Sequence, residues 1–551
     1  MEGKYVNGKE RYEMGVYLNS TTAYTLYKNE VEKPYFVDKS QMLEQLFPLV
    51  SNGNNHICIT RPRRFGKTVM ANMIAAYFSK ACDAEGIFKD LKIAKSELYN
   101  KYRNKFSVIH ISFNDVVARC TSYEQYIGRI QERLIRDLKR EYPEVQFYGE
   151  MDVVDILIDI YAENPEARFI FVLDEWDYIF HQDFVTEKDK KSYLQFLRSL
   201  LKDRPYVLLA YMTGILPIAK YSSGSELNMF LEYTMITEER FSEAFGFTNT
   251  EVDMLYERYL KTNENIRVTR EGLKEWYNGY HTYSGERVYN PRSVVSALGN
   301  NNLGNYWTSA GPYDEIYYYI ERNIDDVRDD LALMISHISV SAKIQEYAAT
   351  SMNLQTKDEI FSAMVVYGFL SYKNGKVSIP NRELMEKFAD MLQKEPSLGY
   401  IYRLAKESNR MLEATLVGDT DTMIEILELA HDTEVPLLHY NNEVELTAVV
   451  NLVYLAARDM YRIEREDKAG KGYVDFIFYP EIDRTADCII LELKVDHTPE
   501  DAIAQIKEKK YALRFAGKLG ETKRYTGRIL AVGISYDKDK KKHYCKVEVL
   551  S

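Results

Sequence analysis

The chain has 551 residues, of which 46% are hydrophobic and 28% are charged, and its formal net charge is −12. A chain of this length exceeds one ordinary hydrophobic core, so we expect several domains. The composition is typical of globular proteins and excludes the disordered and fibrous classes. The acidic balance excludes a protein that coats nucleic acid over its whole surface, so any nucleic-acid contact must be local.

The five cysteines are far apart and odd in number. Without a C-x-x-C pair they predict neither a disulfide framework nor a zinc site, and they suit a reducing compartment. Residues 1–19 mix charges and lack the apolar core of a signal peptide, and no apolar stretch reaches the length of a membrane span. We therefore expect a cytoplasmic protein with no membrane partner.

The first half of the chain alternates short apolar runs with helical patterns. The apolar runs predict strands at 56–59, 106–113, 169–173 and 206–211. Helical spacing predicts helices at 69–78 and 126–138. Strands that alternate with helices are typical of a parallel sheet with crossover helices, so this half predicts an α/β domain.

The second half changes its pattern twice. Residues 238–395 are predicted to be mostly helical, with a turn near Asn300 and a short extended pair at 368–380. A long helical pattern at 442–462 is followed by predicted strands and one helix, at 474–479, 488–494, 499–515 (the helix) and 528–534.

The predicted fold class is therefore α/β multidomain, with a second, separate α/β unit near the C-terminus. The expected divisions are a lead segment, a P-loop domain, a mostly helical domain and a C-terminal α/β domain, at 1–30, 31–237, 238–400 and 401–551.

Residues 61–68, here called the P-loop, follow an apolar strand and open a helix. Their sequence is Arg61-Pro62-Arg63-Arg64-Phe65-Gly66-Lys67-Thr68. This is the context that the phosphate-binding motif G-x-x-x-x-G-K-[ST] requires. Backbone N–H groups and the helix N-terminus would cradle the phosphates of ATP, Lys67 would reach the β and γ phosphates, and Thr68 would ligate Mg²⁺. Arg61 replaces the first glycine, so the loop cannot rely there on glycine's conformational freedom.

A pair of carboxylates supplies the second half of this predicted site. The apolar run 169–173 ends in Asp174 and Glu175, at the edge of the sheet where ligands of open α/β sheets bind. Asp174 is expected to hold Mg²⁺ and Glu175 to polarise the attacking water. A basic turn and a strand that ends in solvated charges are the alternative, but loop and strand together favour a magnesium–nucleotide site.

Other polar residues are candidates for the same site. Thr213 follows a further strand, where AAA-type ATPases place a residue that senses the γ phosphate. Arg63, Arg64 and Arg240 are candidates to stabilise transition-state charge, although arginines are more often surface or ion-pair residues.

A third constellation, here called the C-terminal site, lies on two predicted strands. Asp475 is on one strand, and Glu492 and Lys494 are two residues apart on the next, so the latter two face the same side. Two carboxylates form a hard oxygen site for Mg²⁺ or Mn²⁺, and a lysine can orient the water that attacks a phosphodiester. The flanks are apolar, and unpaired charges are costly there without function. A Glu–Lys pair on an exposed strand is the alternative.

The stretch 507–528 is locally basic, with eight basic and two acidic residues. It is a candidate phosphate track for nucleic acid, and a solvated helix face is the alternative.

Together these motifs resemble a bacterial family with an AAA-ATPase-like N-terminal domain and a C-terminal domain of the PD-(D/E)XK nuclease superfamily. Besides the P-loop, the resemblance rests on Tyr35-Phe36-Val37-Asp38-Lys39-Ser40, V-L-D-E-W-D at 172–177, W-Y-N-G-Y at 276–280, Y-N-P at 289–291 and the C-terminal G-Y-V-D…L-E-L-K-V. It implies that Arg61 is a family feature. It also implies that Glu443 and Gln505 join Asp475, Glu492 and Lys494, with Glu445 an alternative to Glu443. The aromatic W-Y-N-G-Y and Y-N-P segments suggest packing between domains.

The leading hypothesis is an ATP-dependent enzyme in which the nucleotide gates a metal-dependent nuclease, with DNA preferred to RNA as the partner. The second is an ATPase switch whose C-terminal domain binds nucleic acid or a protein without cleaving. The third is a non-enzymatic nucleotide sensor in which Arg61 abolishes hydrolysis. A homo-oligomer stays open, because AAA-type sites often borrow an arginine from a neighbouring subunit.

Overall fold

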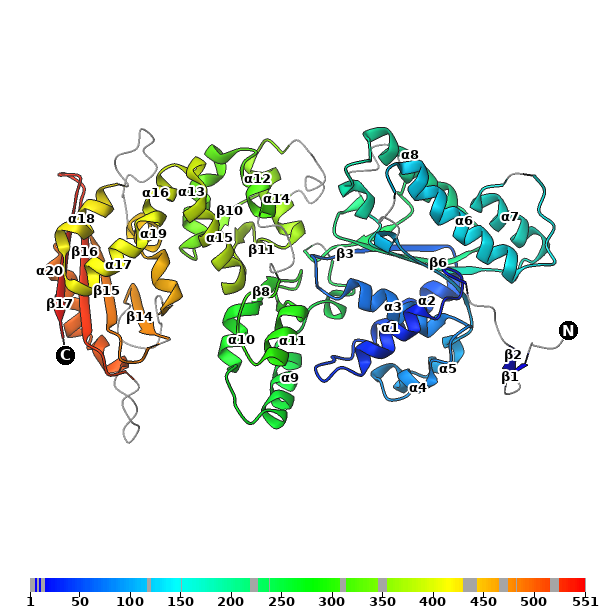
Figure 1. Cartoon of the computed structure of the whole chain (residues 1–551), viewed down its shortest axis with the longest axis horizontal. Coiled ribbons are helices and arrows are strands. Elements are labelled where there is room, and N and C mark those ends of the chain that lie inside the picture. The colour runs from blue at the N-terminus through cyan, green and yellow to red at the C-terminus, as the bar shows by residue number, and fades with distance from the viewer. Residues whose placement is uncertain are drawn as a thin grey trace.

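The computed structural model describes most of the chain, in the ranges 5–6, 9–10, 15–115, 120–149, 151–218, 226–236, 238–307, 314–344, 354–429, 443–464, 474–481, 483–515 and 525–550. Along its longest axis an α/β domain from the N-terminal half is followed by a helical middle region and then by a C-terminal α/β domain (Figure 1). This arrangement confirms the predicted fold class. The described helices are all too short or too polar to cross a lipid bilayer.

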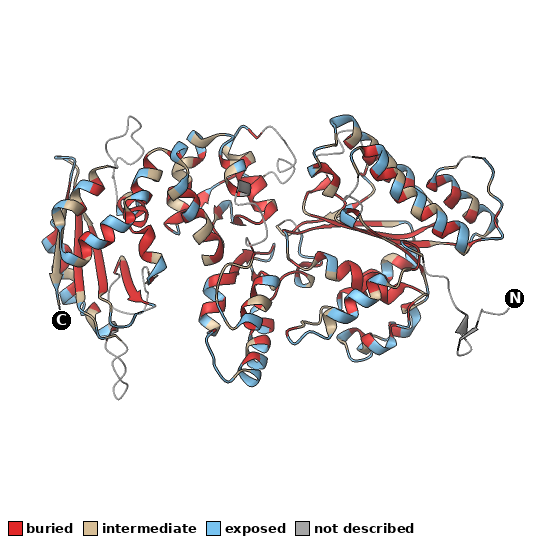
Figure 2. Ribbon diagram, viewed as in Figure 1, coloured by how far each residue is buried: buried red, intermediate tan, exposed pale blue. Residues whose placement is uncertain are grey.

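The N-terminal sheet is parallel throughout, in the order β4-β5-β6-β3-β7. Its strands are β3 (Asn55–Thr60), β4 (Ser107–Ser112), β5 (Phe169–Asp174), β6 (Val207–Gly214) and β7 (Leu231–Tyr233). β5 and β6 are buried along their whole length, because helices cover both faces of a parallel sheet (Figure 2). The prediction of this sheet is confirmed, although β7 was not expected.

Two groups of helices cover this sheet (Figure 1). One face carries α1 (Thr22–Val31), α2 (Met42–Asn52), α3 (Lys67–Phe78), α4 (Glu85–Phe88) and α5 (Tyr99–Tyr102). The other face carries α6 (Tyr123–Glu141), α7 (Val153–Glu163) and α8 (Glu187–Leu201). Alternate residues of β5 enter the two cores, as the strand period requires: Phe171 and Leu173 on the side of α6–α8, and Ile170 and Val172 on the side of α1–α5.

The middle region contains two packed units. The first has its own core and consists of α9 (Asn249–Thr262), α10 (Arg270–Tyr277), the hairpin β8 (Asn278–His281) and β9 (Arg287–Tyr289), and α11 (Pro291–Asn300). The second consists of α12 (Asp314–Ile320), α13 (Ile324–Ile335), α14 (Lys357–Tyr367), α15 (Arg382–Lys394), α16 (Tyr400–Lys406), α17 (Ser408–Val417) and α18 (Thr420–Glu428). Short antiparallel strands accompany it, namely β10 (Val340–Ser341), β11 (Ser371–Lys373) and β12 (Lys376–Ser378).

The C-terminal sheet has the order β13-β14-β15-β16-β17. Its strands are β13 (Tyr461–Glu464), β14 (Phe476–Pro480), β15 (Cys488–Val495), β16 (Ile529–Asp537) and β17 (Lys542–Val549). Only the β15–β16 pair within this described sheet is parallel, and α20 (Pro499–Glu508) crosses between those two strands. Helix α19 (Glu443–Val453) packs on β15 in one core, and α20 packs on the sheet in another.

The structure corrects the predicted helix at 442–462, whose first residue lies outside the described residues. The helix ends at Val453 and is followed by a 3-10 turn at Leu455–Asp459 and by β13. Tyr461 pairs with Pro480 of β14, so sheet pairing takes the chain away from the helix axis. The apolar residues after Val453 stay buried in the turn, which is why their spacing suggested a longer helix.

The predicted helix at 499–515 is also too long. It ends at Glu508, because Lys510 adopts a left-handed conformation with φ of 55°, and a 3-10 turn at Tyr511–Arg514 follows. Strands β13 and β17 were not expected.

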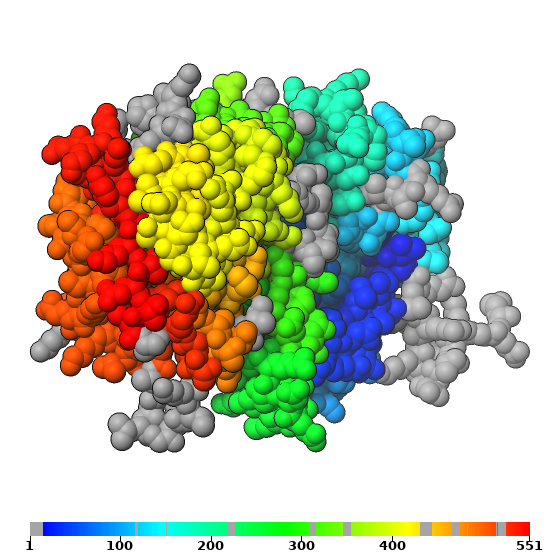
Figure 3. Space-filling model, turned by 60° about the vertical axis from the view of Figure 1, so that its left-hand side comes forward, coloured from blue at the N-terminus to red at the C-terminus, as the bar shows by residue number. Residues whose placement is uncertain are grey.

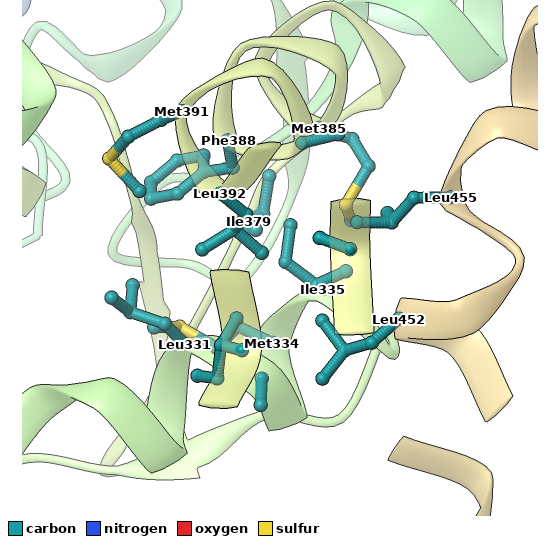
Figure 4. Close-up of a cluster of buried hydrophobic side chains, with 14 of the residues drawn as sticks. Leu331, Met334, Ile335, Ile379, Met385, Phe388, Met391, Leu392, Leu452 and Leu455 are labelled. Atoms are coloured by element: carbon teal, nitrogen blue, oxygen red, sulfur yellow. The ribbon is translucent and has the colours of Figure 1, made fainter. Parts of the chain in front are cut away.

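The second unit of the middle region shares one continuous hydrophobic core with the C-terminal sheet. Figure 4 shows Leu452 of α19 and Leu455 beside Ile335 of α13 and Met385 of α15. In Figure 3 the yellow helices α16–α18 lie against the orange and red C-terminal domain, and α18 contacts β17. Because packed interiors transmit strain, a displacement of these helices would also strain the C-terminal sheet.

This continuity predicts that Leu452→Ala destabilises α13 and α15 together with the C-terminal sheet. Leu452 is fully buried, and removing such a side chain costs about 2–5 kcal/mol. Native-state hydrogen exchange in increasing denaturant would report the loss in each element. Val444→Ala, at an exposed position of the same helix, is the matched control. A loss confined to the C-terminal sheet would contradict a shared core.

Candidate functional site

The P-loop connects β3 to α3. Gly66 caps the helix with φ of 92°, and its missing Cβ would meet open space, so the glycine serves the backbone conformation rather than close packing. Lys67 is buried, and its Nζ donates to the carbonyl oxygens of Arg61 at 2.9 Å and Pro62 at 3.0 Å. Burial lowers the pKa of this amine, and the carboxylates of Asp177, Asp174 and Glu175 oppose that shift.

Arg61 fixes the start of the P-loop to the neighbouring strand. Its side chain is buried, and Nη1 donates to the carbonyl oxygens of Thr60 at 2.7 Å and Tyr233 at 2.8 Å. The guanidinium also lies 5.0 Å from the centre of the Phe245 ring. The residue that replaces the first glycine thus supports the loop, and its contact with a nucleotide stays a prediction.

Both predicted carboxylates, Asp174 and Glu175, lie at the C-terminal end of β5, and Thr213 lies beside them at the end of β6. The Thr213 hydroxyl donates to Oδ1 of Asp174, which is fully buried. Oδ2 of Asp174 has no hydrogen-bond partner among the described residues. A buried carboxylate oxygen without a partner is unfavourable by itself, and a cation would satisfy it.

Glu175 lies next to this position with φ of 53°, a conformation that side-chain-bearing residues rarely adopt. Burial raises the pKa of its carboxyl, as does the nearby Asp174, whereas Lys67 and a hydrogen bond with Asn114 lower it.

Two polar residues of this site were missed in the sequence. Asp177 accepts hydrogen bonds from the backbone N–H groups of Ile215 at 2.8 Å and Leu216 at 2.7 Å, so it ties the end of β5 to the end of β6. Asn114 contacts Glu175 from the end of β4. Both follow strands at the carboxyl edge of the sheet, and that position was the available signal.

A cavity of about 820 Å³ opens beside the P-loop. Gly66, Lys67 and Thr68 line it together with Glu175 and Asp177. Part of its wall comes from the segment 35–37 and from the start of α11, including Tyr35, Phe36, Val37, Pro291, Arg292 and Val295. Three segments of the family resemblance, at 35–40, 172–177 and 289–291, therefore border the same cavity as the P-loop.

The three candidate arginines are placed differently. Arg63 and Arg64 line the cavity. The cavity wall as described does not include Arg240, which donates to the carbonyl oxygen of Gln45 at 3.0 Å and lies over the Phe241 ring.

In the C-terminal site, Asp475 directly precedes β14, and Glu492 and Lys494 lie near the end of β15. Oδ2 of Asp475 accepts from the backbone N–H of Leu493 at 2.7 Å. Oε1 of Glu492 accepts from Nζ of Lys494 at 3.0 Å and from the side-chain amide of Gln505 on α20. Glu492 is buried, and its Oε2 has no hydrogen bond of standard geometry within the described part of the chain. Burial raises the pKa of Glu492 to about 7, helped by Asp475 and opposed by Lys494.

The choice between Glu443 and Glu445 and the basic stretch 507–528 are the remaining predictions for this site. Glu443 is exposed on the first turn of α19, and Glu445 is half-buried on the same turn, so the choice between them stays open. Residues 516–524 of the basic stretch lie outside the described residues, and Lys507 and Arg528 form ion pairs with Glu548 and Asp487. The described residues contain no group of three His, Cys, Asp or Glu side chains arranged to hold a metal.

Comparison with known families agrees with this geometry. Residues 27–223 match the family described as "Predicted AAA-ATPase", and residues 445–544 match the PD-(D/E)XK nuclease superfamily. The chain joins an AAA-ATPase-like domain to a PD-(D/E)XK nuclease superfamily domain. The P-loop and Asp174 lie in the first matched range. Asp475, Glu492, Lys494 and Gln505 lie in the second, which begins two residues after Glu443.

Sequence identity to individual proteins is low. An uncharacterized protein in the vnfD 5′ region of Azotobacter chroococcum mcd 1 is 26% identical over 282 residues, which are 50% of this chain and 51% of that protein. The chain thus spans about half the length of this relative. A Walker-type ATPase of Pyrococcus abyssi has 11% identity and a TM-score of 0.36, over 64% of this chain and 94% of that one. The ORC2 protein of Aeropyrum pernix, solved in ADPNP and ADP complexes, has 12% identity and a TM-score of 0.29, over 70% and 96%.

The environment of Glu492 predicts a pH-dependent stability. Because the pKa of this carboxyl is raised from 4.5 to about 7, the folded state binds the proton more tightly than the unfolded state. The contribution of the group to stability is fully present below pH 4.5 and is lost as the pH rises through 7. Glu492→Gln should therefore raise the midpoint of thermal unfolding in EDTA at pH 8 and change it little at pH 5.

Thermal unfolding of both proteins at the two pH values checks this prediction. Glu508→Gln, an exposed position on α20, should leave the midpoint unchanged at either pH. An equal effect of Glu492→Gln at pH 5 and pH 8 would show that the buried charge is not its cause.

Proposed function

We propose that this protein is an ATP-dependent, metal-dependent nuclease that acts on nucleic acid, with DNA preferred to RNA. One observation carries the proposal: each candidate site contains a buried carboxylate, Asp174 or Glu492, with one oxygen that makes no hydrogen bond of standard geometry within the described residues. Divalent cations such as Mg²⁺ bind carboxylate oxygens, and both predicted sites need such a cation.

In the proposed nucleotide site, Lys67 exchanges the carbonyl oxygens of Arg61 and Pro62 for phosphate oxygens. The N–H groups at the start of α3 bind the same phosphates. Thr68 and Asp174 would hold Mg²⁺, which supplies charge neutralisation for phosphoryl transfer. Glu175 would accept a proton from the attacking water, and its hydrogen bond with Asn114 would restrain it until the substrate is bound.

The base of the nucleotide is proposed to bind at the apolar part of the cavity. Tyr35, Val37 and Val295 line that wall, and flat apolar surface is what a purine ring requires. Arg292, an exposed residue of α11 that lines the same cavity, would bring positive charge from the middle region to the phosphates.

In the proposed nuclease site, Asp475 and Glu492 would hold Mg²⁺ or Mn²⁺, which supplies an activated water and neutralises charge on a phosphodiester. Lys494 orients the attacking water, and Gln505 fixes the Glu492 carboxylate through its side-chain amide. A carboxylate from the first turn of α19, either Glu443 or Glu445, would complete the proposed nuclease site. The domain ranges 1–30, 31–237, 238–400 and 401–551 stay proposed divisions, in which α17 and α18, described above with the middle region, fall in the last range and α16 begins at its boundary.

A second candidate function is an ATPase switch whose C-terminal domain binds nucleic acid or a partner without cleaving. The state of Glu492 favours it, because Oε1 already accepts hydrogen bonds from Lys494 and Gln505. A pKa of about 7 also keeps part of the carboxyl population protonated near neutral pH.

The ATPase half predicts that Glu175→Gln lowers the rate of phosphate release from ATP by about 100-fold or more, because a general base contributes that much. ATP should still bind, since glutamine preserves the shape of the side chain. Phosphate release and nucleotide retention, measured on the same preparation with Mg²⁺, check both statements. Unchanged hydrolysis would remove Glu175 from the proposed role.

The nuclease half predicts metal-dependent cleavage that Asp475→Ala abolishes and that ATP alters in rate. Plasmid, linear and single-stranded DNA and RNA are the substrates, with Mg²⁺ or Mn²⁺ and with or without ATP. Asp483→Ala, an exposed carboxylate in the loop after β14, is the matched control and should cleave normally. ATP hydrolysis without cleavage of any substrate would favour the switch.

A further inference from the structure

Glu383 is a buried carboxylate of the middle region that belongs to neither candidate site. It lies in the first turn of α15 and is 2% exposed. The helix is capped by Asn381, whose side chain accepts from the backbone N–H of Leu384 at 3.1 Å, so this turn is well defined. A carboxylate buried this deeply requires specific partners.

The partners of Glu383 are a backbone segment and a hydroxyl. One oxygen, Oε1, accepts from the backbone N–H groups of Tyr306 and Trp307, each at 2.6 Å. The Ser293 hydroxyl on α11 donates to Oε2 at 2.9 Å. Burial raises the pKa of Glu383 to about 7, and these hydrogen bonds and Arg64 lower it. Glu383 thus fixes the path of Tyr306 and Trp307.

The same two residues contact the middle of the P-loop. Nε1 of Trp307 donates to the carbonyl oxygen of Arg63 at 3.2 Å, and the guanidinium of Arg64 donates to the carbonyl oxygen of Tyr306. Arg64 has φ of 68°, an unfavourable conformation for an arginine that persists only where the surrounding structure holds it. This conformation explains why the loop needs contacts from outside it at this point.

The turn that carries Glu383 is itself anchored. Arg382 donates from Nη2 to Glu481 at 3.1 Å and from Nη1 to the other oxygen of that carboxylate at 3.4 Å. Its guanidinium lies 4.6 Å from the centre of the Trp276 ring. Because Glu481 follows β14 of the C-terminal sheet, Glu383 is fixed with respect to that domain as well as to the helical core.

We propose that Glu383 is a positioning residue for the P-loop, which it acts on through Tyr306 and Trp307. The inference rests on the proposed nucleotide site, because it concerns the shape in which the loop meets phosphate. Glu383 does not touch the cavity; it keeps the Arg63–Arg64 backbone in the conformation that leaves the following N–H groups turned toward the ligand. The middle region is thereby a structural part of the nucleotide site.

The test compares Glu383→Leu with Glu383→Gln in the full chain. Glutamine can reproduce the native pattern, since its oxygen can accept both backbone N–H groups and its amide can donate to Ser293. Leucine leaves those two N–H groups buried without an acceptor. Equilibrium binding of a fluorescent ATP analogue with Mg²⁺ should weaken by about tenfold or more in Glu383→Leu, as such buried groups imply. Glu383→Gln should bind within about threefold of the unchanged chain.

Asp390→Leu, an exposed carboxylate on the same helix, is the matched control and should bind normally. Trp307→Phe keeps an aromatic ring in place but removes the donor to the carbonyl oxygen of Arg63, so it should also weaken binding. This variant replaces Glu383→Leu in the test if Glu383→Leu does not fold. Equal binding by all four variants and the unchanged chain would overturn the positioning role. A loss in Glu383→Gln as large as in Glu383→Leu would also overturn it, because the pattern of hydrogen bonds would then not be the cause. Absence of binding by the unchanged chain would instead refute the proposed nucleotide site.

Discussion

Residues outside the P-loop support it, and the rest of the structure depends on this interaction. Its first position is an arginine that donates to Thr60 and Tyr233, and Phe65 packs edge-on against Tyr280 of the middle region, with ring centres 5.0 Å apart. Gly368 allows equally close contact at Pro62, because a Cβ there would lie 2.6 Å from the proline Cβ. Contacts of the middle region with Phe65 and Pro62 are therefore part of the environment of this loop.

The two candidate sites follow the same physical pattern. Each lies where strands end, so that polar side chains emerge from a buried sheet, and each contains a carboxylate that is costly to bury without a cation. Between them runs a continuous core from α13 and α15 to the C-terminal sheet. Binding energy gained at one end can therefore bias the other end through packed elements rather than through a flexible linker.

Much of the fold could be predicted because its signals are local, and local signals also suggested the central residues of both candidate sites. An apolar run followed by Asp174 and Glu175, or a glycine and lysine at the start of a helix, can be recognised without tertiary structure. The helix at 442–462 was wrong because pairing of Tyr461 with Pro480 overrides its periodicity. Asp177 and Asn114 were missed because their partners lie on other strands. The contact of Tyr280 with Phe65 joins positions more than 200 residues apart, which no local pattern encodes.

Calorimetric titration of the full chain with ATP and Mg²⁺ tests the central claim most directly. We expect one ATP bound per chain, with binding that requires Mg²⁺ and is lost in Lys67→Ala, because Lys67 is the only lysine among the P-loop residues 61–68. ATP binding that is the same in Lys67→Ala as in the unchanged chain would contradict it.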